Sequence, residues 1–221
     1  MLNRMVHSGM NALEHELVEV NAAVVRMLSQ VREGVQLARR ALIDEDAEAV
    51  ERCIAGDALV DAAQHELESR CLTIVARRQP AAGDLRFLGA VLLALADIER
   101  AGDYAVHVAR AGVELAKRPP LKKYTDIKRI LEIEDGMLDT TIAALAESDE
   151  AAARSALAMD EEIDELYEQI QRELLTYMIE DHRTITQATQ LLAVGRYLER
   201  LGDHIENVCE HIIFWLTAER V

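Results

Sequence analysis

The 221-residue sequence is poor in aromatic residues, proline and cysteine, and it lacks long hydrophobic runs. Aromatic residues make up 4% of the chain, which has three prolines and three cysteines. The cysteines are far apart and form no Cys-x-x-Cys pair, so neither a disulfide framework nor a zinc site is expected from them. The longest apolar run, residues 88–96, is far shorter than the ~20 residues of a transmembrane helix. Since no apolar signal-peptide core is visible either, we expect a soluble, cytoplasmic protein without direct membrane insertion.

Positive charge is scarce as well. The chain has 24 Lys and Arg residues against 40 Asp and Glu residues, which gives a formal net charge of −16 at pH 7. The resulting field repels phosphate backbones and anionic lipid headgroups, so nucleic acid is not an expected partner. Acidity of this kind is common on the solvated outer faces of helices, and it does not by itself indicate a site.

Residues that favour helices dominate what remains. Half of the chain is hydrophobic, and alanine, leucine, glutamate and arginine are abundant. Apolar residues recur every three or four positions, which is the pattern of one face of a helix. A residue before proline disfavours helix, so the second segment should end before Pro80, and Asp84 is a plausible N-cap for the third. The expected helices cover about 10–42, 46–79, 84–113, 124–146, 150–179 and 184–217.

The six helices fall into two halves. Two adjacent prolines in a basic stretch, residues 117–120, form the clearest break in the chain. Each half carries three predicted helices in the same order. The sequence therefore predicts an all-α fold of two tandem three-helix bundles, with domains at 1–118 and 119–221.

A five-residue motif, Glu-Arg-x-Gly-Asp, occurs on the last predicted helix of each half. Its copies run from Glu99 to Asp103 and from Glu199 to Asp203, an offset of 100 residues. Residues four apart share one face of a helix, so each motif places two carboxylates together. Such like-charge pairs are destabilising by ~0.2–0.5 kcal/mol in an isolated helix. The duplication of an unfavourable pair suggests that a cation lies between the carboxylates.

The preceding helices carry further acidic stripes at steps of four residues. Antiparallel packing of the second and third helices would bring these stripes to the motifs, and the motif glycines would permit a close approach. An oxygen-rich site with at most one or two imidazoles favours hard or borderline cations such as Mg²⁺, Mn²⁺ or iron. The stripes are Asp57, Asp61 and His65 in the first half, and Asp160, Asp164 and Glu168 in the second.

Other interpretations stay open at this point. Glu99 can instead pair with an arginine, and Gly102 can be a simple packing notch. No Glu-x-x-His pair, Gly-rich phosphate loop, nucleophile elbow or His-Glu-x-x-His sequence is present, so no catalytic constellation is visible. Arg86, close to a helix start, could bind an anion together with free backbone N–H groups. Single histidines such as His204 and His211 are more often structural than ligands.

Several segments together resemble the PhoU family of phosphate-signalling proteins. The resemblance extends over nearly the whole chain and includes both copies of the acidic motif. It implies two tandem three-helix bundles, usually dimeric, that bind metal clusters at their surfaces through Glu/Asp-x-x-x-Asp motifs. The segments that carry it are 78–80, 84–86, 97–107, 160–167, 174–178 and 196–207.

The resemblance also implies a set of metal ligands and a role. The metal is expected to be iron, manganese, zinc or magnesium. By analogy the protein is not an enzyme but an adaptor that restrains phosphate uptake and the phosphate-starvation response. Its expected partners are the ATPase subunit of the phosphate ABC transporter, a phosphate sensor histidine kinase and a second copy of itself. The ligands carried over by position are Glu99, Asp103, Glu199 and Asp203, with Asp61, Asp160 and Asp164 from the partner helices.

Two alternatives remain beside the adaptor. One is a metal-dependent phosphohydrolase that uses the carboxylate clusters as a two-metal site. It would need groups that hold a substrate phosphate, and only Arg86, Arg100 and Arg200 are near enough in sequence. The other is a structural helical scaffold whose acidic residues are solvated faces.

Overall fold

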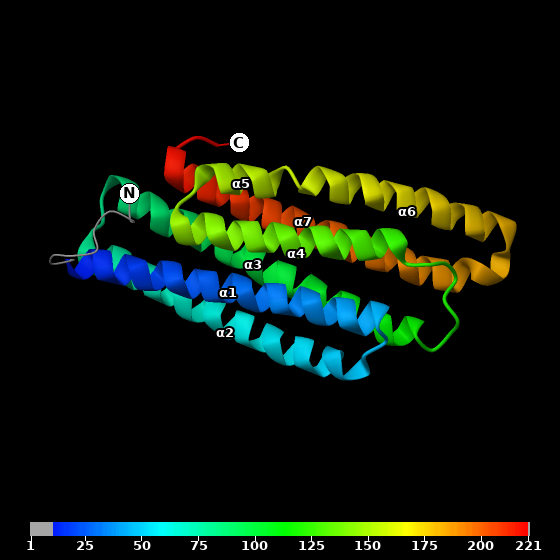
Figure 1. The fold of residues 1–221 in the computed structure, drawn as a ribbon. Coiled ribbons are helices and arrows are strands. Elements are labelled where there is room, and N and C mark those ends of the chain that lie inside the picture. Colours follow the sequence, from blue (N-terminus) through cyan, green and yellow to red (C-terminus); the bar gives the residue numbers. More distant parts are fainter. Residues whose placement is uncertain (1–10, 221) are drawn as a thin grey trace.

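A computed structural model describes residues 11–220, and these form helices and connecting turns without any strand. Figure 1 shows two bundles side by side with their helices along one long axis, and α5 and α6 aligned end to end as a single arm. The all-α fold of two three-arm bundles is therefore confirmed. The first bundle contains α1 Ala12–Ile43, α2 Ala47–Arg78 and α3 Ala82–Leu115; the second contains α4 Thr125–Glu147, α5 Glu150–Leu157, α6 Asp160–Glu180, the 3₁₀ turn η2 His182–Thr184 and α7 Ile185–Thr217.

Short polar side chains set several helix ends close to their expected places. Asn11 and Glu14 form a reciprocal capping box at the start of α1, with both hydrogen bonds at 2.9 Å. Asp46 accepts two backbone N–H bonds from the first turn of α2. Gln79 then ends α2 in the left-handed region, with φ at 49°, immediately before Pro80. These local signals explain why the boundaries of α1 and α2 are readable from sequence.

The start of α3 differs from the prediction that Asp84 is its N-cap. The helix begins at Ala82, and its N-cap Ala81 makes no side-chain hydrogen bond. Asp84 lies in the first turn, where its own backbone N–H bonds to the carbonyl of Ala81 at 3.2 Å. Its carboxylate still lies at the positive end of the helix dipole, so it stabilises α3 electrostatically without capping it.

A second difference is a break in the helix expected over residues 150–179. The last turn of α5 tightens at Ala158 and Met159, whose backbone N–H groups bond to Arg154 and Ala156. The helix then resumes as α6 at Asp160. Because Asp160 is the first residue of α6, the break places a carboxylate at an N-terminus, where a negative charge is favoured.

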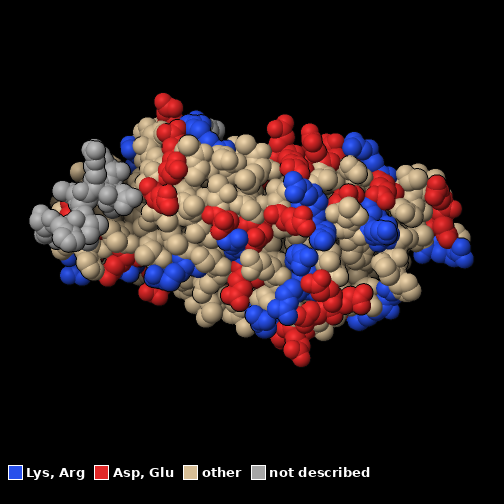
Figure 2. All heavy atoms as spheres, in the orientation of Figure 1, with Lys and Arg blue, Asp and Glu red and all other residues tan. Residues whose placement is uncertain are grey.

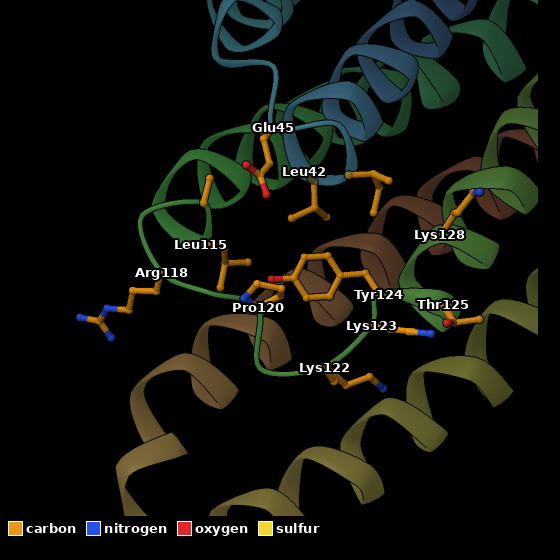
Figure 3. Close-up of a pocket in the computed structure, with 12 residues that line it drawn as sticks. Leu42, Glu45, Leu115, Arg118, Pro120, Lys122, Lys123, Tyr124, Thr125 and Lys128 are labelled. Carbon is orange, nitrogen blue, oxygen red and sulfur yellow. The ribbon is translucent and has the colours of Figure 1, made fainter.

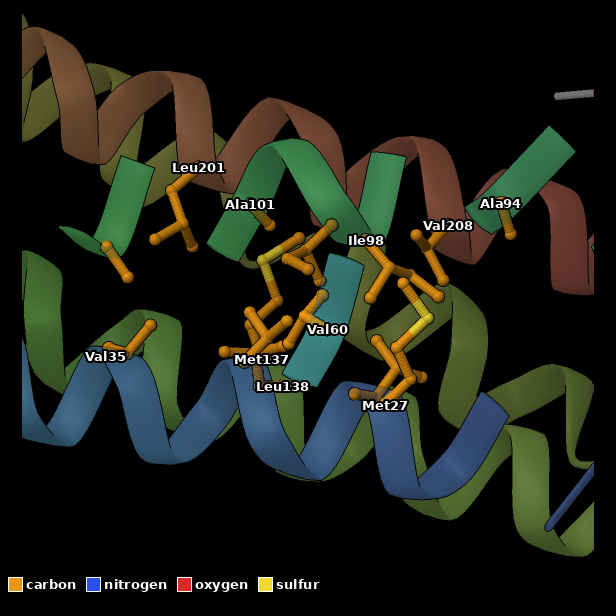
Figure 4. Packing of buried hydrophobic residues seen from close by; sticks show 14 of the residues in the cluster. Met27, Val35, Val60, Ala94, Ile98, Ala101, Met137, Leu138, Leu201 and Val208 are labelled. Atoms are coloured by element: carbon orange, nitrogen blue, oxygen red, sulfur yellow. The ribbon is translucent and has the colours of Figure 1, made fainter. Parts of the chain in front are cut away.

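One hydrophobic core runs through both bundles. In Figure 4, Met27 of α1, Ile98 of α3, Met137 of α4 and Val208 of α7 point into a common interior. The two helices that carry the acidic motif, α3 and α7, pack against each other more extensively than any other pair. Within residues 11–220, no helix combines the length and hydrophobicity needed to cross a bilayer.

Candidate metal centre

Each bundle presents acidic side chains from two neighbouring helices at equivalent places. On α7, buried Leu198, Leu201 and Ile205 face the core, which leaves Glu199 and Asp203 half-buried at the edge of the same face. The facing helix of the second bundle is α6, and Figure 2 shows acidic side chains gathered along the edge of the molecule over this helix. The amphipathic pattern of α7 thus places the motif carboxylates against α6.

The second bundle contains two overlapping groups of three carboxylates. Asp160, Asp203 and Glu206 form one group, and Asp164, Glu199 and Asp203 form the other; in each, the candidate ligand oxygens lie within 4.8 Å of one another. Asp203 belongs to both groups. The structure therefore brings together all four ligands predicted for this half. Glu206 was not predicted, although its position three residues after Asp203 places it on the same helix face.

Burial and mutual repulsion make these carboxylates hard to ionise. Burial raises the pKa of Asp160 to about 7, and the charge of Glu206 adds to this effect. The pKa values of Glu199 and Asp164 are also raised, first by partial burial and then by the charge of Asp203. A bound cation would remove this repulsion, which fits a site for a positively charged ligand.

A completely buried glutamate of α4 lies behind this group. Both carboxylate oxygens of Glu134 lack a hydrogen-bond partner in the described structure, as does Oδ1 of Asp160. Burial raises the pKa of Glu134 well above its ordinary value, with a further contribution from Asp160. Buried polar groups are normally satisfied, so these unpaired oxygens indicate that a proton or a cation is held there. Glu134 was missed because it belongs to a helix that carries no acidic motif.

The glycine of each motif makes room for a carboxylate of the facing helix. A β-carbon at Gly202 would collide with Oδ1 of Asp160, and a β-carbon at Gly102 would lie 2.8 Å from Oδ1 of Asp57. The close approach expected at these glycines is therefore made by an aspartate side chain of the facing helix, which lies against the glycine backbone. It also identifies Asp57 as the counterpart of Asp160 in the first bundle.

The first bundle has the same elements in a looser arrangement. Burial raises the pKa of Asp57 to about 6, and the charges of Asp103, Asp61 and Glu99 follow as further causes, so these four acids face one another. Among the described residues, however, the compact groups of three lie in the second bundle. Asp61 is exposed on α2. The two halves therefore differ in how closely they gather the predicted ligands.

The arginine inside each motif makes only outer contacts with the acids. Arg100 and Arg200 approach the aspartate three residues later, Asp103 and Asp203, with N–O distances of 3.3 Å in both copies. Both guanidinium groups are largely exposed, and exposed ion pairs of this kind contribute about 0–1 kcal/mol. Each arginine also lies near the preceding glutamate, at 3.5 Å for Glu99 and 3.7 Å for Glu199, yet the pKa values of both glutamates stay raised.

Two histidines near the motif bind the other bundle rather than the carboxylate cluster. His204 Nδ1 lies 2.9 Å from Asp97 Oδ1, and His211 Nε2 lies 3.4 Å from Asp97 Oδ2, so α7 is joined to α3. Asn207 donates to the same carboxylate at 3.3 Å. Burial alone would raise the pKa of Asp97, but the histidine hydrogen bonds outweigh it and lower this pKa to about 2. The structural interpretation of these histidines fits this geometry.

Arg86 uses one of its donors within the fold. Its Nε donates to the backbone carbonyl of Trp215, at 2.8 Å, near the end of α7. This bond satisfies one of the carbonyls that a helix leaves free at its C-terminus. The interaction ties the start of α3 to the second bundle.

The repeated architecture is also found in known proteins. Two stretches of the chain, residues 24–112 and 127–212, each match the family model described as the PhoU domain. The chain belongs to the PhoU family. The two matches include both Glu-Arg-x-Gly-Asp motifs and the acidic residues of α2 and α6, so the candidate ligands lie at repeated positions of the PhoU domain.

Relatives and solved structures extend the PhoU match over nearly the full chain. A phosphate-specific transport system accessory protein PhoU homolog from Deinococcus radiodurans is 46% identical, covering 95% of this chain and 98% of the relative. A homolog from Aquifex aeolicus is 37% identical over 84% of both chains. The crystal structure of PhoU from Pseudomonas aeruginosa superposes with a TM-score of 0.89, at 32% identity and with 93% and 99% of the two chains covered.

A further PhoU structure supports the same arrangement. The phosphate transport system regulatory protein PhoU from Streptococcus pneumoniae gives a TM-score of 0.87 at 28% identity, covering 95% of this chain and 99% of that one. The resemblance to PhoU proteins is therefore confirmed by both sequence and structure.

Proposed function

We propose that this chain is a metal-binding, non-enzymatic regulator of phosphate transport. The proposal is supported by its relatives, which are named phosphate-specific transport system accessory proteins, and by a structural neighbour titled a phosphate transport system regulatory protein. In this role it restrains phosphate uptake and the phosphate-starvation response. We place it in the cytoplasm, as a homodimer that contacts the ATPase subunit of the phosphate ABC transporter and a phosphate sensor histidine kinase.

The metal-binding part of the proposal rests on one observation, the position of Asp203 in two groups of three carboxylates. Oxygen ligands of this kind suit magnesium, manganese and iron, while zinc more often takes histidine or cysteine ligands. Asp160 and Glu206 would hold one ion, and Asp164 and Glu199 the other. A bound ion would supply positive charge and coordination positions open to an anionic group of a partner. Asp57, Asp61, Glu99 and Asp103 would form the weaker site of the first bundle.

A phosphohydrolase has no comparable support. It requires cations that hold the substrate phosphate next to the metals. Arg86 donates to a main-chain carbonyl, and Arg100 and Arg200 turn toward the aspartates of their own motifs. An adaptor needs only a surface whose shape or charge depends on the ion.

The regulatory role can be tested in a strain that lacks the gene. A phosphate-starvation promoter is expected to be active there in phosphate-rich medium, and the wild-type gene should silence it. The double variant Asp103→Asn, Asp203→Asn should leave the promoter active at an equal amount of protein. These changes keep the side-chain size and remove one carboxylate from each centre.

The matched control removes two acidic charges elsewhere. Asp139 and Glu162 are exposed and pair with arginines outside the acidic centres. The double variant Asp139→Asn, Glu162→Gln should therefore silence the promoter as the wild type does. A silent promoter in the deletion strain would contradict the regulatory role. Full silencing by the Asp103→Asn, Asp203→Asn variant would show that regulation does not need the metal centre.

A further inference from the structure

The lysines of this acidic chain are confined to one place. All four lie between residues 117 and 128, in the connection between the bundles and the first turn of α4. With Arg118 and Arg129, residues 117–129 contain six cationic side chains and one acidic side chain, Asp126. In a chain with a formal net charge of −16, this segment is a local positive region. A concentration of cations against the overall charge indicates a site that attracts anions.

This positive segment forms one wall of a cavity between the two bundles. The cavity has a volume of about 420 Å³ and lies among the ends of α1 and α3 and the start of α4 (Figure 3). Its volume is within the range of about 300–1,000 Å³ that is usual for small-molecule sites. The site is separate from the acidic centres, because none of their residues lines it.

The inner surface of the cavity is apolar and aromatic. Leu42 from α1 and Leu115 from α3 are buried residues that contribute to its wall. Tyr124, which is half-buried, places its ring in the middle of the cavity between these leucines and the connection (Figure 3). An aromatic face in an apolar pocket suits a flat ring system, which it contacts by stacking. The cavity therefore offers a binding surface for more than a bare ion.

The charged groups at the rim are of two kinds. Lys122 is 9% exposed and pairs with Glu173 of α6 and, at 3.4 Å, with Asp126, so it has a structural role. Lys123 and Lys128 are exposed, line the cavity, and form no ion pair with any residue from 11 to 220. Figure 3 shows these two lysines on the α4 side of the cavity. Their long, flexible side chains are thus free to pair with a bound anion.

A helix N-terminus adds to the positive potential. The 23-residue helix α4 begins at Thr125, which lines the cavity, and its N-cap Tyr124 makes no side-chain hydrogen bond. The first backbone N–H groups of a helix have no partner within the helix, and the helix dipole gives this end a partial positive charge. Helix N-termini bind phosphate groups for this reason. Glu45 is the one acidic residue in the cavity wall, against four cationic ones.

We infer that this cavity binds a phosphorylated small molecule of nucleotide size. Its ring would lie against Tyr124, and its phosphate would pair with Lys123, Lys128 and the start of α4. A free nucleotide fits better than a nucleic acid strand, because the acidic surface beyond the cavity repels a long polyanion. The ligand would contact both bundles, since α1 and α3 belong to one and α4 to the other.

The test is calorimetric titration of the full chain with adenosine monophosphate in buffer containing EDTA. The chelator removes divalent ions, so the result is independent of the proposed metal centres. The wild type is expected to bind. The variant Lys123→Gln, Lys128→Gln should bind at least about tenfold more weakly, as expected for the loss of charge-assisted bonds to phosphate. The matched control Arg77→Gln, Arg78→Gln removes two exposed cations at the end of α2, at the opposite end of the first bundle from the cavity, and should bind as the wild type does.

A second variant separates the ring from the phosphate. Tyr124→Leu keeps an apolar side chain, and helix α4 loses no cap because Tyr124 makes no capping bond. This variant should bind adenosine monophosphate more weakly and ribose 5-phosphate as the wild type does. Circular dichroism of both variants checks that the helical fold is unchanged.

Four results would overturn the inference. The first is no binding of adenosine monophosphate up to millimolar concentration, and the second is equal binding by the wild type and the double-lysine variant. The third is equal affinity for inorganic phosphate and adenosine monophosphate. The fourth is binding to phosphatidylglycerol vesicles without binding to the nucleotide. The last result would assign the cations to a lipid headgroup. A failure of the acidic centres to bind metal would not change any of these four measurements, because all are made in the presence of EDTA.

Discussion

Oδ1 of Asp160 lies in the space that a β-carbon at Gly202 would fill. Glycine at this position therefore has a chemical consequence as well as a packing one, because it allows a buried carboxylate to reach the face of α7. The same relationship holds between Asp57 and Gly102 in the first bundle, where the separation is 2.8 Å. Both copies of the motif thus position an aspartate from the neighbouring helix.

Gly202→Ala should displace Asp160 and weaken both metal binding and the fold. Forcing an extra methyl group into a packed site is destabilising by about 1–3 kcal/mol. The matched control is Gly136→Ala in α4, where a β-carbon would meet nothing within 4 Å. That change should stabilise the protein by roughly 0.5–1 kcal/mol, because alanine favours helix over glycine. Urea denaturation of the metal-free proteins measures the free energy of unfolding of both variants. Equal stabilisation by the two changes would contradict the role of Gly202.

Asp203→Asn should reduce metal binding more than any other single change of an acidic residue. Asp203 is shared by both groups of three carboxylates, whereas Glu206 belongs to one. Removal of even an outer partner weakens metal affinity by about 10–100-fold, so the loss of a shared ligand should have at least this effect. Glu206→Gln should impair one site only. Equilibrium dialysis against manganese followed by elemental mass spectrometry gives the number and affinity of the ions.

The two bundles should also differ in metal affinity. Asp103→Asn, the equivalent change in the first bundle, should have a smaller effect than Asp203→Asn, because the compact groups within residues 11–220 lie in the second bundle. The same dialysis experiment measures this difference. Equal losses from the two variants would mean that the looser carboxylates of the first bundle close around an ion.

The metal-free protein should lose stability as the pH rises from about 4 to about 7. The pKa of Asp160 is raised to about 7 by burial first and nearby acids second, and that of Asp57 to about 6. In this pH window the folded state binds more protons than the unfolded state, so the free energy of unfolding falls as these protons are lost. Glu134, whose pKa is also raised, acts in the same direction. The lowered pKa of Asp97 affects stability only at more acidic pH.

Asp160→Asn provides the check on this pH dependence. Denaturation with EDTA present should show a smaller decrease in stability for the variant than for the wild type between these pH values. Glu162→Gln, at an exposed position of the same helix, should retain the full decrease. A wild-type stability that increases with pH over this range would contradict the raised pKa values.

Asp97→Ala should weaken the contact between the bundles. The change leaves His204 and His211 without their shared acceptor, at a cost of about 1–3 kcal/mol for unsatisfied, partly buried groups. Asp139→Ala breaks an exposed ion pair with Arg32 and should cost about 1 kcal/mol or less. Thermal denaturation compares the two, and a smaller loss for Asp97→Ala would mean that the histidines find other partners.

Much of the fold could be predicted because its signals are local. Helical periodicity, the capping side chain of Asp46 and the proline after Gln79 each act within a few residues. The break between α5 and α6 was missed because the apolar pattern continues through it, and Asp84 was assigned as a cap because the N-cap Ala81 carries no polar side chain to reveal it. Boundaries that depend on tertiary packing leave no such local sign.

The candidate site could be predicted only in part, for a related reason. The motif spacing identified the carboxylates of α3 and α7, since these share a helix face. Glu134 occupies a position of the apolar stripe of α4, between Ile130 and Met137, and a single glutamate in such a stripe is a usable signal. The hydrogen bond from Arg86 to the carbonyl of Trp215 joins residues 129 positions apart, which no short sequence pattern can indicate.

The confinement of the lysines also determines how the chain can be cut. A protease specific for lysine has its only target bonds in and beside the connection, after residues 117, 122, 123 and 128. Because α3 and α7 pack together in one continuous core, the nicked protein should remain a single particle under native conditions. The two long fragments, residues 1–117 and 129–221, each carry one acidic motif and should separate only in denaturant. A chain with two domain matches would then be two polypeptides held by noncovalent packing.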